Sequence, residues 1–115
     1  MAFVNVGKLL SVAPGTLMVY EVGDREIAVC NADGEIYAID NVCTHDGGSL
    51  DQGELIGCEV ECPRHGARFD VRSGDVTVEP AVLPVDTFAV MVEGDDILVD
   101  IEQRGKAPAE LKSRG

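Results

Sequence analysis

The 115-residue sequence contains no tryptophan and has only three phenylalanines and two tyrosines. With so few aromatic side chains, a hydrophobic core has to be built mainly from Val, Ile, Leu and Ala. Hydrophobic residues make up 45% of the chain, which is a usual share for a globular protein. The length is sufficient for one modest core, so we expect a single domain.

Positive charge is also scarce. Nine Lys and Arg side chains stand against 21 Asp and Glu, and the formal net charge is −12. Nucleic-acid binding needs basic patches, so this balance argues against a nucleic-acid partner. Four of the nine bases lie in residues 103–115, which we interpret as a polar, basic tail. Arg64, Arg68 and Arg72 either form a local basic rim that orients docking or pair with nearby acids.

Long hydrophobic runs are absent as well. No stretch approaches the roughly 20 apolar residues that a membrane-spanning helix needs. No basic segment followed by an apolar one marks a signal peptide near the start. We therefore expect no membrane association and a cytoplasmic protein, in which the four cysteines need not form disulfides.

Histidine occurs only twice, and each histidine lies close to a cysteine. Cys43-x-His45 and Cys62-x-x-His65 are separated by sixteen residues. Two thiolates and two imidazoles can bind one metal centre, either a structural zinc or a [2Fe–2S] cluster with cysteines on one iron and histidines on the other. A catalytic deaminase zinc needs His-x-Glu and Pro-Cys-x-x-Cys, and neither is present. We interpret Cys30 and Cys58 as small buried hydrophobes in strands.

Turn signals recur about every ten residues, and apolar residues alternate between them with a period of two. This pattern is typical of an all-β sandwich or barrel. The loops that carry the Cys and His pairs span about residues 41–53 and 62–74. Strands are expected over residues 3–6, 17–22, 27–30, 35–40, 54–61, 67–71, 75–79, 85–93 and 97–101.

The residues around the two pairs, 43–48 and 62–70, resemble the Rieske [2Fe–2S] motif, and the resemblance covers about residues 3–102. It implies an antiparallel β sandwich or barrel with a two-loop subdomain that holds one [2Fe–2S] cluster. It also implies that Cys43, His45, Cys62 and His65 are the ligands. The chain then divides into a Rieske domain, 1–102, and the tail, 103–115.

Four residues that differ from those in related motifs indicate which branch of the family this sequence resembles. Gly48 and Arg64 stand where Rieske proteins of cytochrome bc complexes have a disulfide. Ala67 and Phe69 stand where the high-potential branch has Ser and Tyr, whose hydroxyls donate hydrogen bonds to sulfur. Their absence predicts a potential in the lower part of the Rieske range. The combined pattern resembles soluble Rieske-type ferredoxins, which supply electrons to ring-hydroxylating dioxygenases.

The resemblance implies an electron carrier that is not itself an enzyme. Its expected partners are a flavin-dependent ferredoxin reductase and a terminal oxygenase, with docking over His45 and His65. Two alternatives are the small subunit of an assimilatory nitrite reductase and a structural Cys2His2 zinc module. Gly66 is expected to let a backbone N–H point at sulfur, and Leu50 to pack as an ordinary loop residue rather than to shield the cluster.

Overall fold

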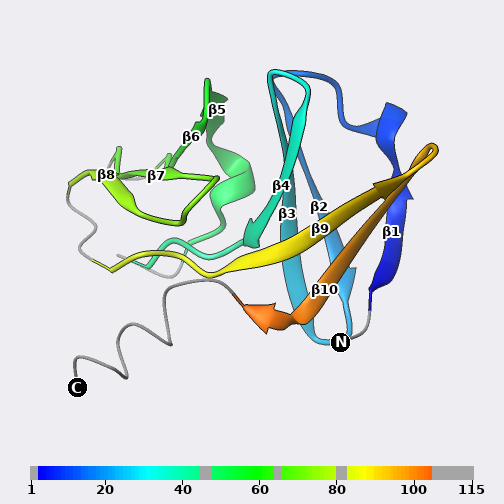
Figure 1. Cartoon of the computed structure of the whole chain (residues 1–115). Helices are drawn as coiled ribbons and strands as arrows, with labels where there is room; N and C mark the ends of the chain where they lie inside the picture. Colours follow the sequence, from blue (N-terminus) through cyan, green and yellow to red (C-terminus); the bar gives the residue numbers. More distant parts are fainter. Residues whose placement is uncertain (1–2, 45–47, 64–65, 80–82, 105–115) are drawn as a thin grey trace.

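The computed structural model describes residues 3–44, 48–63, 66–79 and 83–104 (Figure 1). These ranges contain ten β-strands and two short 3-10 helices, and every strand pair is antiparallel. No helix within them is long and apolar enough to span a membrane. The all-β fold expected from the alternating sequence pattern is therefore confirmed.

The larger sheet has six strands in the order β1-β10-β9-β4-β3-β2. Its two edge strands, β1 and β2, come into contact, so the sheet curls into a nearly closed barrel (Figure 1). The helix η1 (Leu9–Ser11) connects these two edge strands. The strands are β1 (Val4–Lys8), β2 (Leu17–Val22), β3 (Arg25–Ala32), β4 (Glu35–Asp40), β9 (Thr87–Glu93) and β10 (Asp96–Arg104).

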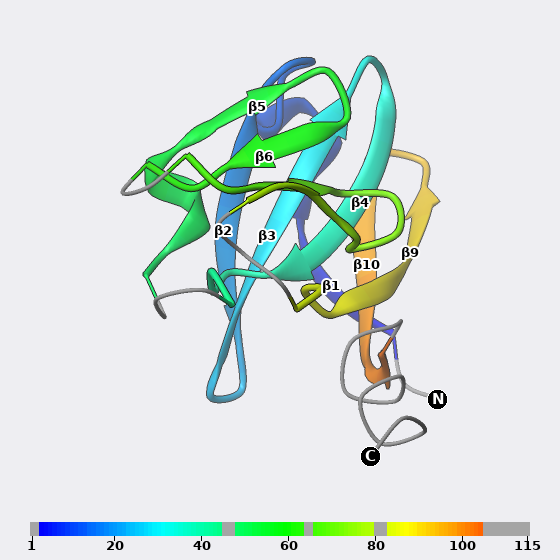
Figure 2. The same cartoon turned by 90° about the vertical axis from the view of Figure 1, so that its left-hand side faces the viewer.

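The smaller sheet has four strands in the order β5-β6-β7-β8. It lies over one face of β3 and β4, in front of the barrel in the view of Figure 2. The helix η2 (Leu50–Gln52) leads from the first ligand loop into this sheet. Its strands are β5 (Glu54–Ile56), β6 (Glu59–Glu61), β7 (Arg68–Asp70) and β8 (Val76–Val78).

The single strand expected over residues 54–61 is wrong, because this segment folds into the β5–β6 hairpin. Gly57 takes a φ of 63° at the turn, a left-handed conformation that glycine adopts without steric cost. Leu55 pairs with Val60 and both side chains pack in the core, whereas Ile56 is 41% exposed, so the two-residue turn shifts the alternation by one position. Cys58 therefore lies in this turn and is half-buried, not in a strand.

The other expected strands are present, with ends displaced by up to three residues. The largest change is at β10, which continues to Arg104 and so includes the first two residues assigned to the tail. The rest of the tail, residues 105–115, lies outside the described residues.

Strand β3 is buried on both faces from Ile27 onward, and this explains the unbroken apolar run over residues 27–30. Ile27 and Val29 face the interior of the barrel, whereas Ala28 and Cys30 face the smaller sheet. Cys30 is fully buried, as expected, and burial raises the pKa of its thiol to about 12. The core between the sheets consists of Ala28, Cys30, Ala32, Ile39, Cys43, Leu50, Val60, Cys62, Ala67, Phe69, Val71 and Val85.

Candidate metal centre

Cys43 and Cys62 belong to the same apolar core, between the barrel and the smaller sheet. Cys43 follows the end of β4 by three residues, and Cys62 follows β6 directly. Both side chains are almost completely buried, with exposed fractions of 0% and 1%. The structure thus places both predicted sulfur ligands in one water-excluded core, whereas His45 and His65 lie outside the described residues.

The first ligand loop is closed by hydrogen bonds at two levels. The N–H of Cys43 donates to the carbonyl of Gly48 at 2.7 Å. Further from the centre of the loop, the side chain of Asn41 forms two hydrogen bonds with Asp51, which lies in η2. Leu50, which lies between Gly48 and Asp51 in the chain, is fully buried in the core that contains Cys43 and Cys62.

The second ligand loop forms a tighter turn. The N–H of Cys62 donates to Ala67 O at 2.7 Å, and the N–H of Gly66 donates back to Cys62 O at 3.0 Å. Gly66 has a φ of 77°, in the left-handed region that favours glycine. The N–H of Gly66 itself is thus used by a carbonyl in the loop, and the expectation that this glycine lets other backbone N–H groups approach sulfur stays a prediction.

The two ligand loops meet where Gly53 passes Glu61. A Cβ atom at Gly53 would overlap the carbonyl oxygen of Glu61 and would lie 3.2 Å from Cδ of Pro63. Only glycine allows the end of the first loop to approach the residue before Cys62 so closely. Gly53 therefore sets the spacing of the two loops.

Thr44 links the first loop to a third segment of the chain. Its Oγ1 donates a hydrogen bond to Leu83 O at 2.6 Å. Val42 and Leu83 have exposed fractions of 40% and 39%, which is high for apolar side chains. Two exposed apolar side chains therefore lie near Thr44, the residue between the two expected ligands Cys43 and His45: Val42 is two positions before it in the chain, and Leu83 accepts its hydrogen bond.

The arginines near the second loop pair with acids where the structure describes them. Arg68 lies 3.5 Å from Glu59 and 3.3 Å from Glu61. Arg72 donates two hydrogen bonds to the carboxylate of Asp70, at 3.0 and 2.8 Å, and lowers the pKa of that group. Pairing is thus the correct alternative for Arg68 and Arg72, and Arg64 lies outside the described residues.

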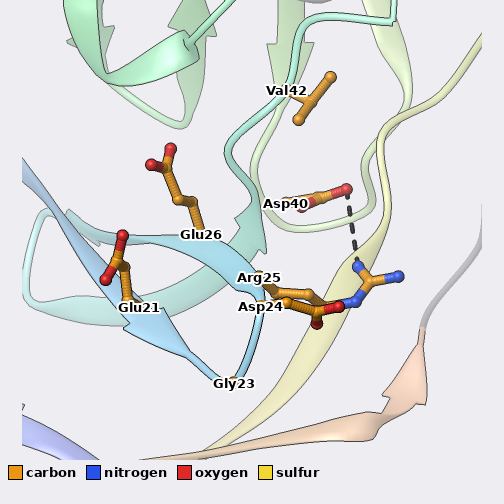
Figure 3. A pocket seen from close by; sticks show the side chains of 7 residues that line it. All are labelled: Glu21, Gly23, Asp24, Arg25, Glu26, Asp40 and Val42. Atoms are coloured by element: carbon orange, nitrogen blue, oxygen red, sulfur yellow. Dashed lines mark ion pairs between the residues drawn. The ribbon is translucent and has the colours of Figure 1, made fainter.

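A polar pocket of about 550 Å³ lies beside the first loop (Figure 3). Arg25 and Asp40 form an ion pair of 3.7 Å on one side of it, and Glu21 and Glu26 lie on the other. Burial raises the pKa of Asp40, and the charge of Arg25 partly opposes this shift. Among the residues that the structure describes, no three His, Cys, Asp or Glu side chains are placed to hold a metal ion, so this pocket is not a second centre.

The described part of the centre fits a [2Fe–2S] cluster. Two cysteines with backbone-fixed loops in an apolar core supply the soft sulfur ligands that iron in such clusters requires. Ala67 and Phe69 lie fully buried in the same core and carry no hydroxyl. Ala67 and Phe69, where the high-potential branch has hydroxyl donors, therefore lie in the same core as the two cysteines.

Two residues important for this geometry were not identified from the sequence. The sequence predicts only the start of a loop at Asn41, although a polar residue directly after a strand and two positions before a ligand is a usable signal. Gly53 carried no signal, because its requirement for glycine comes from contact with Glu61 in another loop.

A family model described as the Rieske [2Fe-2S] domain matches residues 2–89. The ferredoxin component of biphenyl 2,3-dioxygenase from Rhodococcus jostii (strain RHA1) is 41% identical over 102 residues, which are 89% of this chain and 95% of that relative. The ferredoxin of carbazole 1,9a-dioxygenase from Nocardioides aromaticivorans IC177 has a TM-score of 0.82 at 40% identity, covering 86% of this chain and 97% of that one. A structure described as a complex of reduced oxygenase and oxidized ferredoxin in carbazole 1,9a-dioxygenase contains a chain with a TM-score of 0.79 at 33% identity, covering 84% and 91%.

Proposed function

Because the chain belongs to the Rieske [2Fe-2S] domain family, we propose that it is the ferredoxin component of a multicomponent oxygenase. In this role it takes single electrons from a flavin-dependent ferredoxin reductase and passes them to a terminal oxygenase, without catalysing a reaction of its own. The observation that carries the proposal is the 41% identity to a dioxygenase ferredoxin component over 95% of that relative's length. We place this carrier in the cytoplasm, as a soluble protein.

The expected cofactor is confirmed by the family, and its [2Fe–2S] cluster supplies one-electron redox chemistry. We assign Cys43 and Cys62 as ligands of one iron and His45 and His65 as ligands of the other. Burial of the two cysteines excludes water from the sulfur side of the site. Ala67 and Phe69 offer no hydroxyl to the sulfurs, which supports a potential in the lower part of the Rieske range.

The decisive experiment is analysis of the purified chain, followed by electron transfer. We expect two irons and two acid-labile sulfides per chain, with a potential in the lower half of the Rieske range of about −150 to +300 mV. The reduced chain should then transfer its electron to a ring-hydroxylating dioxygenase. One zinc and no visible absorbance would favour the structural zinc module, and a potential near the upper limit would refute the low-potential assignment. Reaction with a nitrite reductase in place of a dioxygenase would favour the alternative of a nitrite reductase small subunit.

The oxygenase should dock on the apolar surface formed by Val42 and Leu83 beside the first ligand loop. The replacement Leu83→Asp puts a charge into this surface while Leu83 O, a backbone atom, still accepts the hydrogen bond of Thr44. Interface residues of this kind contribute about 1–2 kcal/mol, so we expect the apparent KM of the oxygenase for the ferredoxin to rise roughly tenfold. Steady-state kinetics with varied ferredoxin would measure this change.

Val92→Asp provides the matched control. Val92 is 42% exposed on β9, near the β9–β10 turn on the side of the barrel away from the smaller sheet (Figure 1). This variant should have the KM of the unmodified protein. An equal rise in both variants would place docking elsewhere, since net charge alone would then explain the effect.

A further inference from the structure

Asn41 joins the two ends of the first ligand loop. Its side chain is buried, with an exposed fraction of 2%. Nδ2 donates to Asp51 Oδ1 at 2.9 Å, and Oδ1 accepts from the N–H of Asp51, also at 2.9 Å. These two hydrogen bonds join residues 41 and 51, which are ten positions apart, and so close the loop. The backbone hydrogen bond from Cys43 to Gly48 lies inside this closure.

The same side chain fixes the loop to the barrel. Nδ2 also donates to Glu26 Oε1 at 3.1 Å, and the backbone N–H of Asn41 donates to Glu26 O at 3.0 Å. Glu26 belongs to β3, whose buried side chains support both cores, and its carboxylate extends along the pocket wall (Figure 3). The amide nitrogen of Asn41 thus lies between the carboxylates of Glu26 and Asp51 and donates one hydrogen bond to each. Because the amide is uncharged, it does not neutralise either carboxylate.

We propose that Asn41 is a positioning residue for Cys43, and that its contacts with Glu26 and Asp51 hold the first ligand loop around the cluster. This inference rests on the proposed function, because it assumes that Cys43 is a ligand. Ligands have to be held within tenths of an ångström of their productive positions, so a residue that fixes both ends of a ligand loop governs how firmly the metal is held.

The chemistry of the site requires an amide. Asn41 has to donate to two acceptors and accept from one donor at the same time. The nearly isosteric Asn41→Asp change keeps the acceptor but removes both donated bonds. It also brings a third carboxylate against Glu26 and Asp51. Asn41→Ala removes the bonds without adding charge, and so separates lost bonding from added repulsion.

The test measures the rate at which the holoprotein loses its cluster in an excess of an iron chelator. The decay of visible absorbance reports this loss. Hydrogen bonds to charged groups are among the stronger ones, so we expect loss to be about tenfold faster in N41A and faster still in N41D. The double variant N41D/D51N exchanges the amide and the carboxylate between positions 41 and 51. It should therefore recover part of the difference in the rate of cluster loss between N41D and the unmodified protein. This rescue distinguishes positioning of the loop from general damage to the protein.

Asn31 provides a matched control in the same strand as Glu26. It is also buried and also bonded at both ends of its amide: Nδ2 donates to Val12 O at 2.8 Å, and Oδ1 accepts from Gly34 N–H at 2.8 Å. Asn31→Asp should lower the thermal stability yet leave the rate of cluster loss within about twofold of the unmodified protein.

Three outcomes would overturn the role of Asn41. They are an unchanged rate in N41D, an equal acceleration in N31D, or no recovery in N41D/D51N. If N41D assembles no cluster at all, the double variant and N41A decide the question by the same measurement. A wild-type chain that contains no [2Fe–2S] cluster would instead refute the proposed function, so the two failures are distinguishable.

Discussion

Replacement of Cys43 or Cys62 by serine should leave a folded protein that binds almost no iron. Each thiolate is expected to be one of two sulfur ligands from the chain, and serine offers a harder, much more basic oxygen in its place. Changes in residues that merely support a ligand reduce metal affinity by about 10–100-fold, so loss of the ligand itself should reduce it further. Iron and sulfide content after purification, together with visible absorbance, would measure the effect.

The remaining cysteines supply the controls for this prediction. Cys58 lies in the β5–β6 turn and is half-buried, so Cys58→Ser should retain the full iron content. Cys30 is fully buried in the same core as the two proposed ligands, so Cys30→Ala tests whether a cavity in that core is enough to lose the cluster. A loss of iron in Cys30→Ala as large as in Cys43→Ser would contradict the ligand assignment.

Gly53→Ala should be among the most destabilising single changes in the described part of the chain. The new methyl group would overlap the backbone carbonyl of Glu61, which cannot move without displacing β6 and the start of the second ligand loop. Overpacking against a backbone atom gives destabilisation of about 3 kcal/mol or more. Because single domains are stable by only about 5–15 kcal/mol, the midpoint of thermal unfolding should fall by well over ten degrees.

Gly57→Ala is the matched control for this substitution. Gly57 has a φ of 63°, but nothing lies within 4 Å of the Cβ position. The cost should therefore be only the roughly 1–2 kcal/mol of a left-handed alanine, in the turn between β5 and β6. Circular dichroism of the two variants would separate a clash from backbone strain. Equal losses of stability in the two variants would contradict the requirement for glycine at position 53.

The strands that could be predicted from the sequence are those with local signals. Residues 17–22 and 35–40 are predicted to the residue, because turn signals border each of them and apolar residues alternate within 35–40. Residues 54–61 are predicted as one strand because Ile56, Cys58 and Val60 are apolar with a period of two, although the turn at Gly57 divides the segment into two strands. The pairing of β1 with β10 left no local trace at all, since it joins opposite ends of the chain.

The candidate centre shows the same division between local and distant information. Cys43 and Cys62 were identified from their spacing, and the structure places both in one core. The close approach at Gly53 and the hydrogen bond from Thr44 to Leu83 depend on segments brought together only by folding. Pairing of the arginines with acids was one of two alternatives in the sequence. For Arg68 it depends on the β6–β7 ladder, which places Arg68 opposite Glu61, whereas Arg72 pairs with Asp70, two residues away in the chain.

The pairing of the first strand with the last has a consequence for how the protein is made. Val4 pairs with Val99, so β1 has no partner in the ladder of the sheet until β10 has left the ribosome. At roughly 5–20 residues per second, the two ligand loops are synthesised several seconds earlier. The ligand loops are thus exposed before the barrel behind them is complete. The connectivity of the sheet therefore makes closure of the barrel a later event than synthesis of the segments that carry Cys43 and Cys62.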